Sequence, residues 1–173
     1  IIWLRFIWCQ MVCRPLIEVD IFILEITMLD LGRAAVQLPT DEVIADPLLW
    51  LRVMAAERVT HSWAPNFGFK LVVAALRAAG DTGIAAVGEL SCIRYLINAG
   101  EQVTADVCDA FLALTMLPPA VMLPAFGMAE TATCMTYANG YGGADSCIHV
   151  LKESFGALSC KVVPSAELAP GIP

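Results

Sequence analysis

Short apolar runs alternate with helical periods along the middle of this chain, and that alternation limits the folds it can adopt. The runs lie at 34–38, 60–64, 92–97 and 120–124. Between them, apolar residues recur at intervals of three and four, as they do on one face of a helix. Strands joined by helices through right-handed crossovers form a parallel sheet. The sequence therefore predicts an α/β fold with a parallel sheet and crossover helices.

The helical periods carry recognisable start and stop signals. Asp46 followed by Pro47 is a strong helix start, because the carboxylate can cap and proline fits the first turn. Asn66 begins a second period, which Gly80 ends. Thr104 precedes the third period. These signals predict one helix after each of the first three strands of the sheet.

Glycine and proline mark the expected breaks. Gly83 and Gly88 predict a flexible loop over 81–89. Pro124 is expected to end the last strand, after which the chain opens into a loop. The glycine-rich stretch 137–143 reads as a turn, because it lacks the lysine and the Ser or Thr of a phosphate-binding loop.

The N-terminal segment, 1–31, leaves two structures open. Residues 21–24 are β-branched and aromatic, which is typical of a strand. Pro15 and Gly32 would equally suit the start and the end of a helix. At the other end of the chain a short helix is expected over 150–155, followed by a proline-containing tail.

The composition is unusually apolar, with 58% hydrophobic residues and a mean hydropathy of +0.71. A membrane span is the first alternative to a folded core. Charged residues interrupt the apolar N-terminal region at Arg5, Arg14, Glu18, Asp20 and Glu25. No run there reaches the roughly 18 apolar residues that a span requires. We expect no membrane span, since strands buried on both faces raise the average hydropathy.

Charge and cysteine content argue against two other classes of function. The net charge is −7 and the ten Lys and Arg residues are scattered, so nucleic acid is not expected as a partner. None of the seven cysteines forms a Cys-x-x-Cys pair, and the chain has two histidines, which argues against a zinc site. An odd number of cysteines on apolar segments suits free thiols in a reducing cytoplasm.

Polar and aromatic residues gather where three of the expected strands end. They occupy 63–67, 98–101 and 126–131. The carboxyl ends of parallel strands meet at one edge of a sheet, where α/β folds build their sites. The sequence therefore predicts a single site at this edge.

The same three regions carry a family resemblance. Residues 60–69 read THSWAPNFGF, residues 95–103 read YLINAGEQV and residues 122–133 read MLPAFGMAETAT. In this order they resemble the adenylate-forming superfamily, most closely the fatty acyl-AMP ligases and the acyl-activating domains of hybrid polyketide–peptide synthetases. The resemblance covers about 32–143. It implies that this region is a fragment of the large N-terminal domain of such an enzyme, and that 1–31 and 144–173 are divergent.

The resemblance assigns ATP or AMP to the two later loops. Residues matching the family's adenine-side positions are Asn98, Ala99, Gly100, Glu101, Phe126, Gly127, Met128 and Thr131, and the match to the Mg²⁺-coordinating carboxylate is Glu130. Each match also has a plain structural explanation: a strand-to-helix turn, a core phenylalanine or a solvated carboxylate.

The first loop matches the segment that lines the acyl pocket of the family. Trp63, Asn66 and Phe67 are the pocket candidates, and His61 receives no catalytic role because a lone histidine beside a tryptophan is commonly a core residue. The implied substrate is a fatty or other carboxylic acid. The acceptor of the acyl group is left open between an acyl carrier protein and coenzyme A.

Several parts of the family's machinery are missing from the sequence. We find no phosphate loop with a lysine, no matching ribose-binding aspartate after Glu130 and no lid domain. The sequence therefore predicts a partial acyl-AMP ligase that is inactive as an isolated chain; the alternative is a non-catalytic α/β interaction module. Uncovered strand edges and apolar faces also predict self-association.

Overall fold

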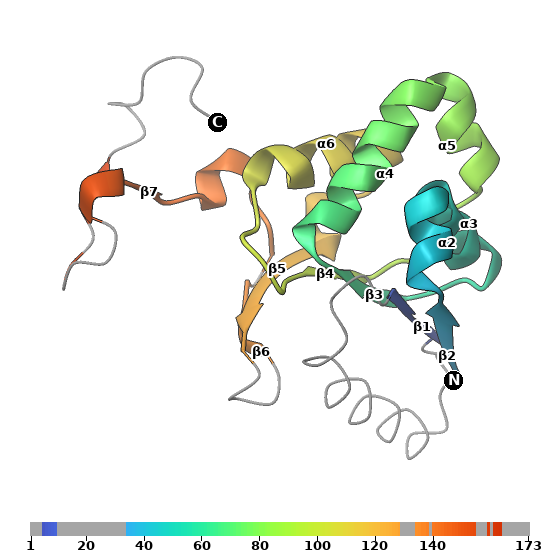
Figure 1. Cartoon of the computed structure of the whole chain (residues 1–173), viewed down its shortest axis with the longest axis horizontal. Helices are drawn as coiled ribbons and strands as arrows, with labels where there is room; N and C mark the ends of the chain where they lie inside the picture. Colours follow the sequence, from blue (N-terminus) through green and yellow to red (C-terminus); the bar gives the residue numbers. More distant parts are fainter. Residues whose placement is uncertain are drawn as a thin grey trace.

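A six-stranded sheet with the order β2-β1-β3-β4-β5-β6 forms the centre of the fold (Figure 1). The computed structural model describes residues 5–9, 34–128, 134–138, 140–154, 159 and 161–163. The strands are β1 (Arg5–Cys9), β2 (Ala34–Leu38), β3 (His61–Ala64), β4 (Tyr95–Asn98), β5 (Met122–Gly127) and β6 (Cys134–Tyr137). β1 to β5 are parallel to their neighbours, and β6 pairs antiparallel with β5. The predicted α/β fold with a parallel sheet is confirmed.

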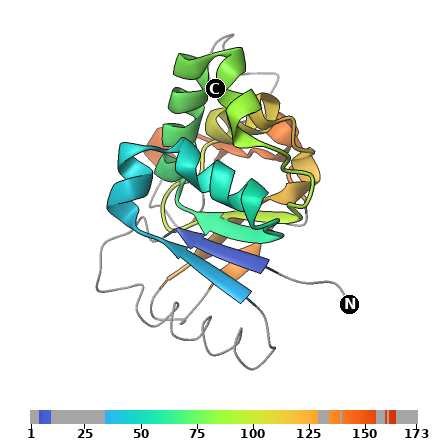
Figure 2. The ribbon, with the colours of Figure 1, turned by 90° about the vertical axis from the view of Figure 1, so that its right-hand side faces the viewer.

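Within the described ranges five α-helices occur. They cover one face of the sheet, as Figures 1 and 2 show from two directions. They are α2 (Thr40–Ala45), α3 (Leu48–Ala56), α4 (Asn66–Ala79), α5 (Asp81–Val87) and α6 (Ala105–Thr115). Short 3-10 turns occur at η1 (Pro119–Val121), η3 (Gly143–Ser146) and η4 (Lys152–Ser154), and β7 (His149–Val150) pairs with β8 (Val162–Val163) as a separate small sheet. No helix in the described ranges is long and apolar enough to cross a membrane.

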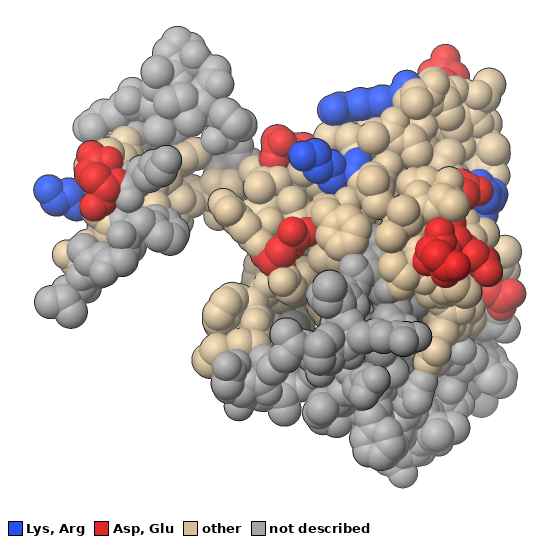
Figure 3. Space-filling view, viewed as in Figure 1, with Lys and Arg blue, Asp and Glu red and all other residues tan. Residues whose placement is uncertain are grey.

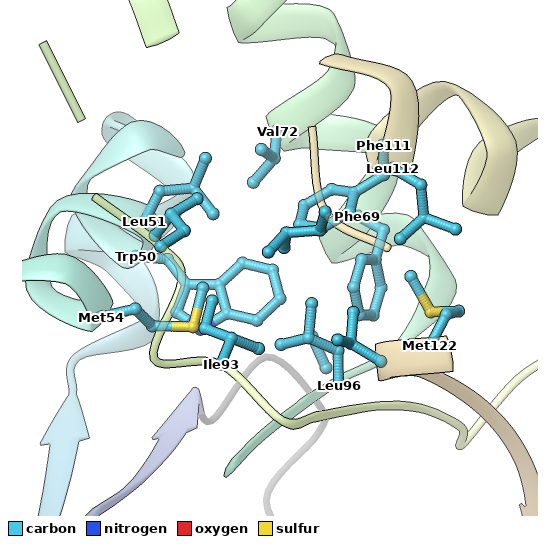
Figure 4. Close-up of a cluster of buried hydrophobic side chains, with 14 of the residues drawn as sticks. Trp50, Leu51, Met54, Phe69, Val72, Ile93, Leu96, Phe111, Leu112 and Met122 are labelled. Carbon is cyan, nitrogen blue, oxygen red and sulfur yellow. The ribbon is translucent and has the colours of Figure 1, made fainter. Parts of the chain in front are cut away.

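Aromatic side chains from three helices form the centre of the core. Trp50 of α3 packs edge-on against Phe69 of α4 with ring centroids 5.2 Å apart, and Phe69 packs the same way against Phe111 of α6 at 5.0 Å. All three are fully buried, above Leu96 and Met122 of the sheet (Figure 4). The apolar helical periods in the sequence thus converge on one core.

The prediction that 81–89 is a loop is wrong, because α5 occupies most of it. Gly83 is buried, and a Cβ there would lie 2.8 Å from the Cβ of Ala79. The glycine therefore permits close packing where α4 turns into α5, rather than flexibility. Gly88, with φ +94°, ends α5 in a conformation that favours glycine.

Pro124 does not end its strand, which is a second correction. β5 continues through Pro124 to Gly127, and the Pro124 carbonyl accepts a hydrogen bond from the Ala138 amide at 2.9 Å. The hairpin partner β6 lies 7 or more positions further along the chain and was not predicted. The short helix expected over 150–155 is confirmed only in part, as the 3-10 helix η4 at Lys152–Ser154, because Val150 belongs to β7. The strand or helix expected around 21–24 falls outside the described residues.

All three predicted helix starts agree with the structure to within two positions, and α4 begins at Asn66 itself. α3 begins at Leu48, directly after Pro47, and the Asp46 carboxylate accepts hydrogen bonds from Arg52 and from the amides of Leu48 and Leu49. The Arg52 hydrogen bond is the largest cause that lowers the pKa of Asp46. α6 begins at Ala105, immediately after Thr104.

The C-terminus of α6 offers a test of backbone strain. Met116 caps this helix in the left-handed conformation, φ 55° and ψ 25°, and is 80% exposed. A residue with a side chain is destabilised by about 1–2 kcal/mol in that conformation, and glycine is not. Glycine also makes the unfolded chain more flexible, which offsets part of this gain in stability. We expect Met116→Gly to raise the free energy of unfolding in urea by about 0.5–1 kcal/mol.

The matched control lies three residues earlier on the same helix. Ala113 is exposed within α6. Ala113→Gly should lower the free energy of unfolding by about 1 kcal/mol, because glycine weakens a helix interior. The same sign for both variants would contradict the strain argument at Met116.

Candidate functional site

The carboxyl ends of three parallel strands lie level with one another. Ala64 at the end of β3 pairs in register with Asn98 at the end of β4, and Asn98 pairs with Pro124 of β5. α4 leaves this edge after Pro65, and the 99–104 loop leaves it toward α6. The structure therefore brings two of the predicted segments to one edge. They are 63–67, called the acyl-side segment, and 98–101, called the adenine-side loop; Phe126 lies on the neighbouring strand.

Asn66 connects the two loops through its side-chain amide. Its Oδ1 accepts hydrogen bonds from Asn98 Nδ2 at 3.1 Å and from the Thr104 amide at 3.4 Å. Its Nδ2 donates to the Thr104 hydroxyl at 3.3 Å. Asn66 is buried, so this predicted pocket residue lies beneath the edge and holds both loops together.

Glu101 makes a second connection between the same loops. Its Oε1 accepts a hydrogen bond from the backbone N–H of Phe67 at 2.5 Å, in the first turn of α4. A carboxylate at a helix N-terminus satisfies a free amide and interacts favourably with the helix dipole. The structure thus places this adenine-side candidate on the helix that begins in the acyl-side segment.

Asn98 and Ala99 are both buried at the end of β4. Asn98 Nδ2 lies 3.5 Å from Cys108 Sγ, and burial is the main cause that raises the pKa of the Cys108 thiol to about 11. Asn98 Oδ1 is buried and has no hydrogen-bond partner among the residues that the structure describes. Thr104 and Cys108 belong to this polar cluster, and only the position of Thr104 before a helix could have pointed to either of them.

Trp63 and Gly100 meet at the edge. A Cβ on Gly100 would lie 3.7 Å from Cζ2 of the Trp63 indole, and Gly100 has φ +91°. A glycine at this position permits a backbone turn that other residues rarely adopt. One acyl-side candidate and one adenine-side candidate are therefore neighbours.

His61 lies at the opposite end of β3 from this edge. Its ring is 4.9 Å from the Tyr95 ring, and its Nδ1 is 2.8 Å from the Thr60 hydroxyl. Burial lowers the pKa of His61, with a smaller contribution from nearby Arg94. His61 is thus partly buried and packed against Tyr95, away from the edge where the three strands end.

Phe126 and Met128 project from the last part of this edge. Phe126 is 58% exposed and Met128 is 45% exposed. The alternative explanation of Phe126 as a core residue is therefore wrong. Glu130 and Thr131 fall outside the described residues. Within the described part, no group of three His, Cys, Asp or Glu residues could hold a metal ion.

Tyr141 is a buried anchor that the sequence analysis missed. Its hydroxyl donates to Asp109 Oδ1 at 2.9 Å and approaches the Ala105 carbonyl at 3.1 Å. Burial, followed by the Asp109 carboxylate, raises the pKa of Tyr141. The aromatic residue within a glycine-rich turn was the available signal, and the contacts fix this turn against α6.

Known proteins with similar sequence or structure show which class of fold this is. Aspulvinone E synthetase melA of Aspergillus terreus is 35% identical over 99 residues, which are 56% of this chain and 11% of that protein. "Probable long-chain-fatty-acid--AMP ligase FadD30" of Mycobacterium tuberculosis is 33% identical over 90 residues, 50% of this chain and 15% of that protein. No family model matches the chain.

A solved structure gives the same answer for the fold. The adenylation and carrier-protein segment of McyG, complexed with phenylalanyl-adenylate, superposes with a TM-score of 0.67 at 30% identity. The match covers 81% of this chain and 22% of that chain. The mostly parallel sheet with its helices is thus the fold of a portion of an adenylation domain.

These matches agree with the resemblance found in the sequence. The chain is homologous to part of the adenylate-forming superfamily, with fatty acyl-AMP ligases and adenylation domains of nonribosomal peptide synthetases among its relatives. It spans between about a tenth and a sixth of the length of the two curated relatives described above.

Proposed function

We propose that this chain forms one wall of an acyl-adenylate-forming site, contributing the adenine-side loop and part of the acyl side. The observation that carries the proposal is the joining of the two loops at one sheet edge by Asn66 and by the Glu101–Phe67 hydrogen bond. The exposed Phe126 ring on the adjacent strand supports it. A flat base could lie against this ring and the exposed backbone of Gly100, while Ala99 is buried beneath it.

In the proposed reaction, the carboxylate of a fatty or other carboxylic acid attacks the α-phosphate of ATP and pyrophosphate leaves. Positioning and electrostatic stabilisation supply most of the catalysis in such transfers. Asn66 would hold the adenine-side loop in place, while Trp63 and Phe67 would contact the acyl group. ATP and Mg²⁺ enter by resemblance, and Glu130 is proposed as the carboxylate ligand to Mg²⁺, a cation that prefers oxygen donors.

A second candidate function is a non-catalytic interaction module. The observation that favours it is that the side chains of Asn66 and Glu101 form hydrogen bonds with other residues of this chain. Residues held in this way stabilise the fold whether or not a ligand binds.

We further propose that the chain is cytoplasmic. The proposed acceptor of the acyl group is an acyl carrier protein or coenzyme A. We also propose that the chain self-associates through open strand edges. Within the described residues, β2 and β6 are the edge strands of the large sheet. A carrier-protein acceptor is supported by the McyG segment, which contains adenylation and carrier parts. Unpaired edges can pair with a second chain.

We expect the purified 173-residue chain to show no ATP–pyrophosphate exchange with fatty or keto acids. The reason is that one wall of the site cannot hold the outgoing phosphates in line. The same chain should bind AMP, with amide shifts in an ¹⁵N-labelled sample centred on Asn98, Ala99, Gly100 and Glu101. Acid-stimulated exchange would overturn the predicted inactivity, and absence of AMP binding would favour the interaction module.

An exposed aromatic residue allows a sharper version of the binding test. Phe126→Ala should weaken AMP binding by about tenfold, because stacking on an aromatic side chain contributes about 1–3 kcal/mol per base. Ile148 is 76% exposed and lies outside the edge, so Ile148→Ala is the matched control and should leave AMP binding unchanged. Equal effects of the two substitutions would contradict a base-stacking role for Phe126.

A further inference from the structure

We infer that Tyr141 is a positioning residue for the adenine-side loop, because its hydroxyl fixes the part of α6 that holds Asn66 and Asn98. The inference rests on the proposed function, which assigns this loop to adenine. The proposed function gives no role to the glycine-rich turn 137–143, to which Tyr141 belongs.

Tyr141 docks its turn on α6. The residue is buried, whereas its neighbours Gly140 and Gly142 are exposed. Its hydroxyl lies 2.9 Å from Asp109 Oδ1 and 3.1 Å from the Ala105 carbonyl oxygen, two positions that are one helical turn apart on α6. The short helix η3, which follows the turn, also lies beside α6 (Figure 1). The turn is therefore fastened to the beginning of α6 through a buried hydroxyl.

This hydroxyl is a donor at neutral pH. Burial, followed by the hydrogen bond with Asp109, raises the pKa of Tyr141 above its ordinary value, so the phenol is protonated. Its single proton can be donated to the Asp109 carboxylate or to the Ala105 carbonyl. Either bond holds the same turn of the helix.

The beginning of α6 in turn holds two residues of the site edge. Thr104, directly before the helix, donates its backbone N–H to Asn66 Oδ1 at 3.4 Å, and its hydroxyl accepts from Asn66 Nδ2 at 3.3 Å. Cys108, in the first turn, has its Sγ 3.5 Å from Asn98 Nδ2. The Tyr141 hydroxyl contacts the residues that follow Thr104 and Cys108 in the sequence. Because close-packed interiors transmit small displacements, a shift of this helical turn would move both edge contacts.

The test is Tyr141→Phe in the 173-residue chain, a change that removes the hydroxyl and keeps the ring. Amide hydrogen exchange is followed at Ala99 in the loop and at Thr104 beside α6, whose amides donate to the Ala64 carbonyl and to Asn66 Oδ1. We expect exchange at both amides to be about fivefold faster, which is the usual contribution of one hydrogen bond expressed as an equilibrium constant. AMP should bind about threefold more weakly, a factor within the same range, because part of the binding free energy is then used to restore the position of the loop.

Tyr95→Phe is the matched control, because Tyr95 is exposed at the other end of β4 and the chemical change is the same. It should leave exchange at Ala99 and Thr104 and the affinity for AMP unchanged. Neither substitution alters a charge, so the small separate groups of acidic and basic side chains in Figure 3 act equally on AMP in all three proteins. The amide of Val72, buried in the middle of α4, reports overall stability.

A purely structural role for Tyr141 has a different signature. If Ala99 and Thr104 accelerated no more than Val72 and AMP affinity were unchanged, Tyr141 would only stabilise the fold, and the inference would be overturned. Equal effects of Tyr141→Phe and Tyr95→Phe on the two amides would also overturn it. If the wild-type chain did not bind AMP, the proposed function would fail, and exchange at Ala99 and Thr104 relative to Val72 would still decide whether Tyr141 holds the loop.

Discussion

Trp50→Ala is expected to lower the free energy of unfolding by about 4 kcal/mol, which is a large part of the roughly 5–15 kcal/mol that stabilises a domain. Trp50 is fully buried, and its ring contacts both Phe69 and Phe111. Its indole Nε1 also donates a hydrogen bond to the Ser62 hydroxyl of β3 at 3.1 Å. The substitution would remove the residue that joins α3 to both the other core helices and the sheet.

The contributions to this loss can be separated with Trp50→Phe. Phenylalanine retains an aromatic ring but loses the hydrogen bond and part of the volume, so we expect a loss of about 1–2 kcal/mol. Ile44→Ala on α2 is the exposed control, since Ile44 is 52% exposed, and should change stability by no more than about 0.5 kcal/mol. Urea titration followed by circular dichroism measures all three. A loss below about 2 kcal/mol in Trp50→Ala would mean that the core closes around the gap.

The contacts of Trp50 also show how far the sequence determined the fold. Helical spacing placed Leu48, Leu51 and Ala55 on one face of α3, but Trp50 is among the most buried side chains of that helix. Periodicity within one helix cannot reveal that Phe69 and Phe111, which are far along the chain, stack around Trp50. The existence of the helix follows from local pattern, whereas its central contact follows from tertiary packing.

The sequence predicts the helices and strands better than it predicts where they end, and the reason is physical. In the sequence Gly83 indicates a flexible joint, yet a missing Cβ also lets two helices approach closely. In the sequence Pro124 indicates a strand end, yet its carbonyl still accepts a hydrogen bond from the amide of Ala138. Glycine and proline each have two structural uses, and the neighbour that decides between them lies elsewhere in the sequence.

The candidate site also has a part that the sequence predicts and a part that it does not. The parallel order of strands predicted that the ends of β3, β4 and β5 share an edge, and their register places them there. The roles of individual polar residues were not predictable, because Asn66 and Glu101 form hydrogen bonds with residues more than 30 positions away. The position of the site is a property of topology, and the use of each side chain is a property of packing.

The largest expected effect at the site comes from Asn98→Asp, which would place a carboxylate in a fully buried position. Asn98 donates to Asn66 Oδ1 and approaches Cys108 Sγ, and aspartate cannot donate to either when ionised. Rotating the Asn66 amide would offer the new carboxylate a donor, but the Thr104 amide would then lose its acceptor. A buried charge without a partner costs about 3–5 kcal/mol, so we expect this loss of stability at neutral pH.

This variant should show a distinctive pH dependence relative to the wild-type chain. Burial disfavours the ionised form, so the folded-state pKa of Asp at position 98 lies above the unfolded value of about 3.9. The folded state then holds the extra proton as pH rises from about 4, so the stability difference between variant and wild type grows with pH. It becomes constant above the folded-state pKa.

Two further variants make the result specific to charge. Asn98→Ala removes the same hydrogen bonds without introducing a carboxylate, and it should lose about 2 kcal/mol with no added pH dependence. Gln102→Glu, the same amide-to-carboxylate change at an exposed position, controls for the effect of an added acidic group at the surface. Urea denaturation of all four proteins between pH 4 and pH 8 gives the differences. A flat difference between Asn98→Asp and wild type across this range would show that water reaches the position, and that the cluster joining the two loops is open rather than closed.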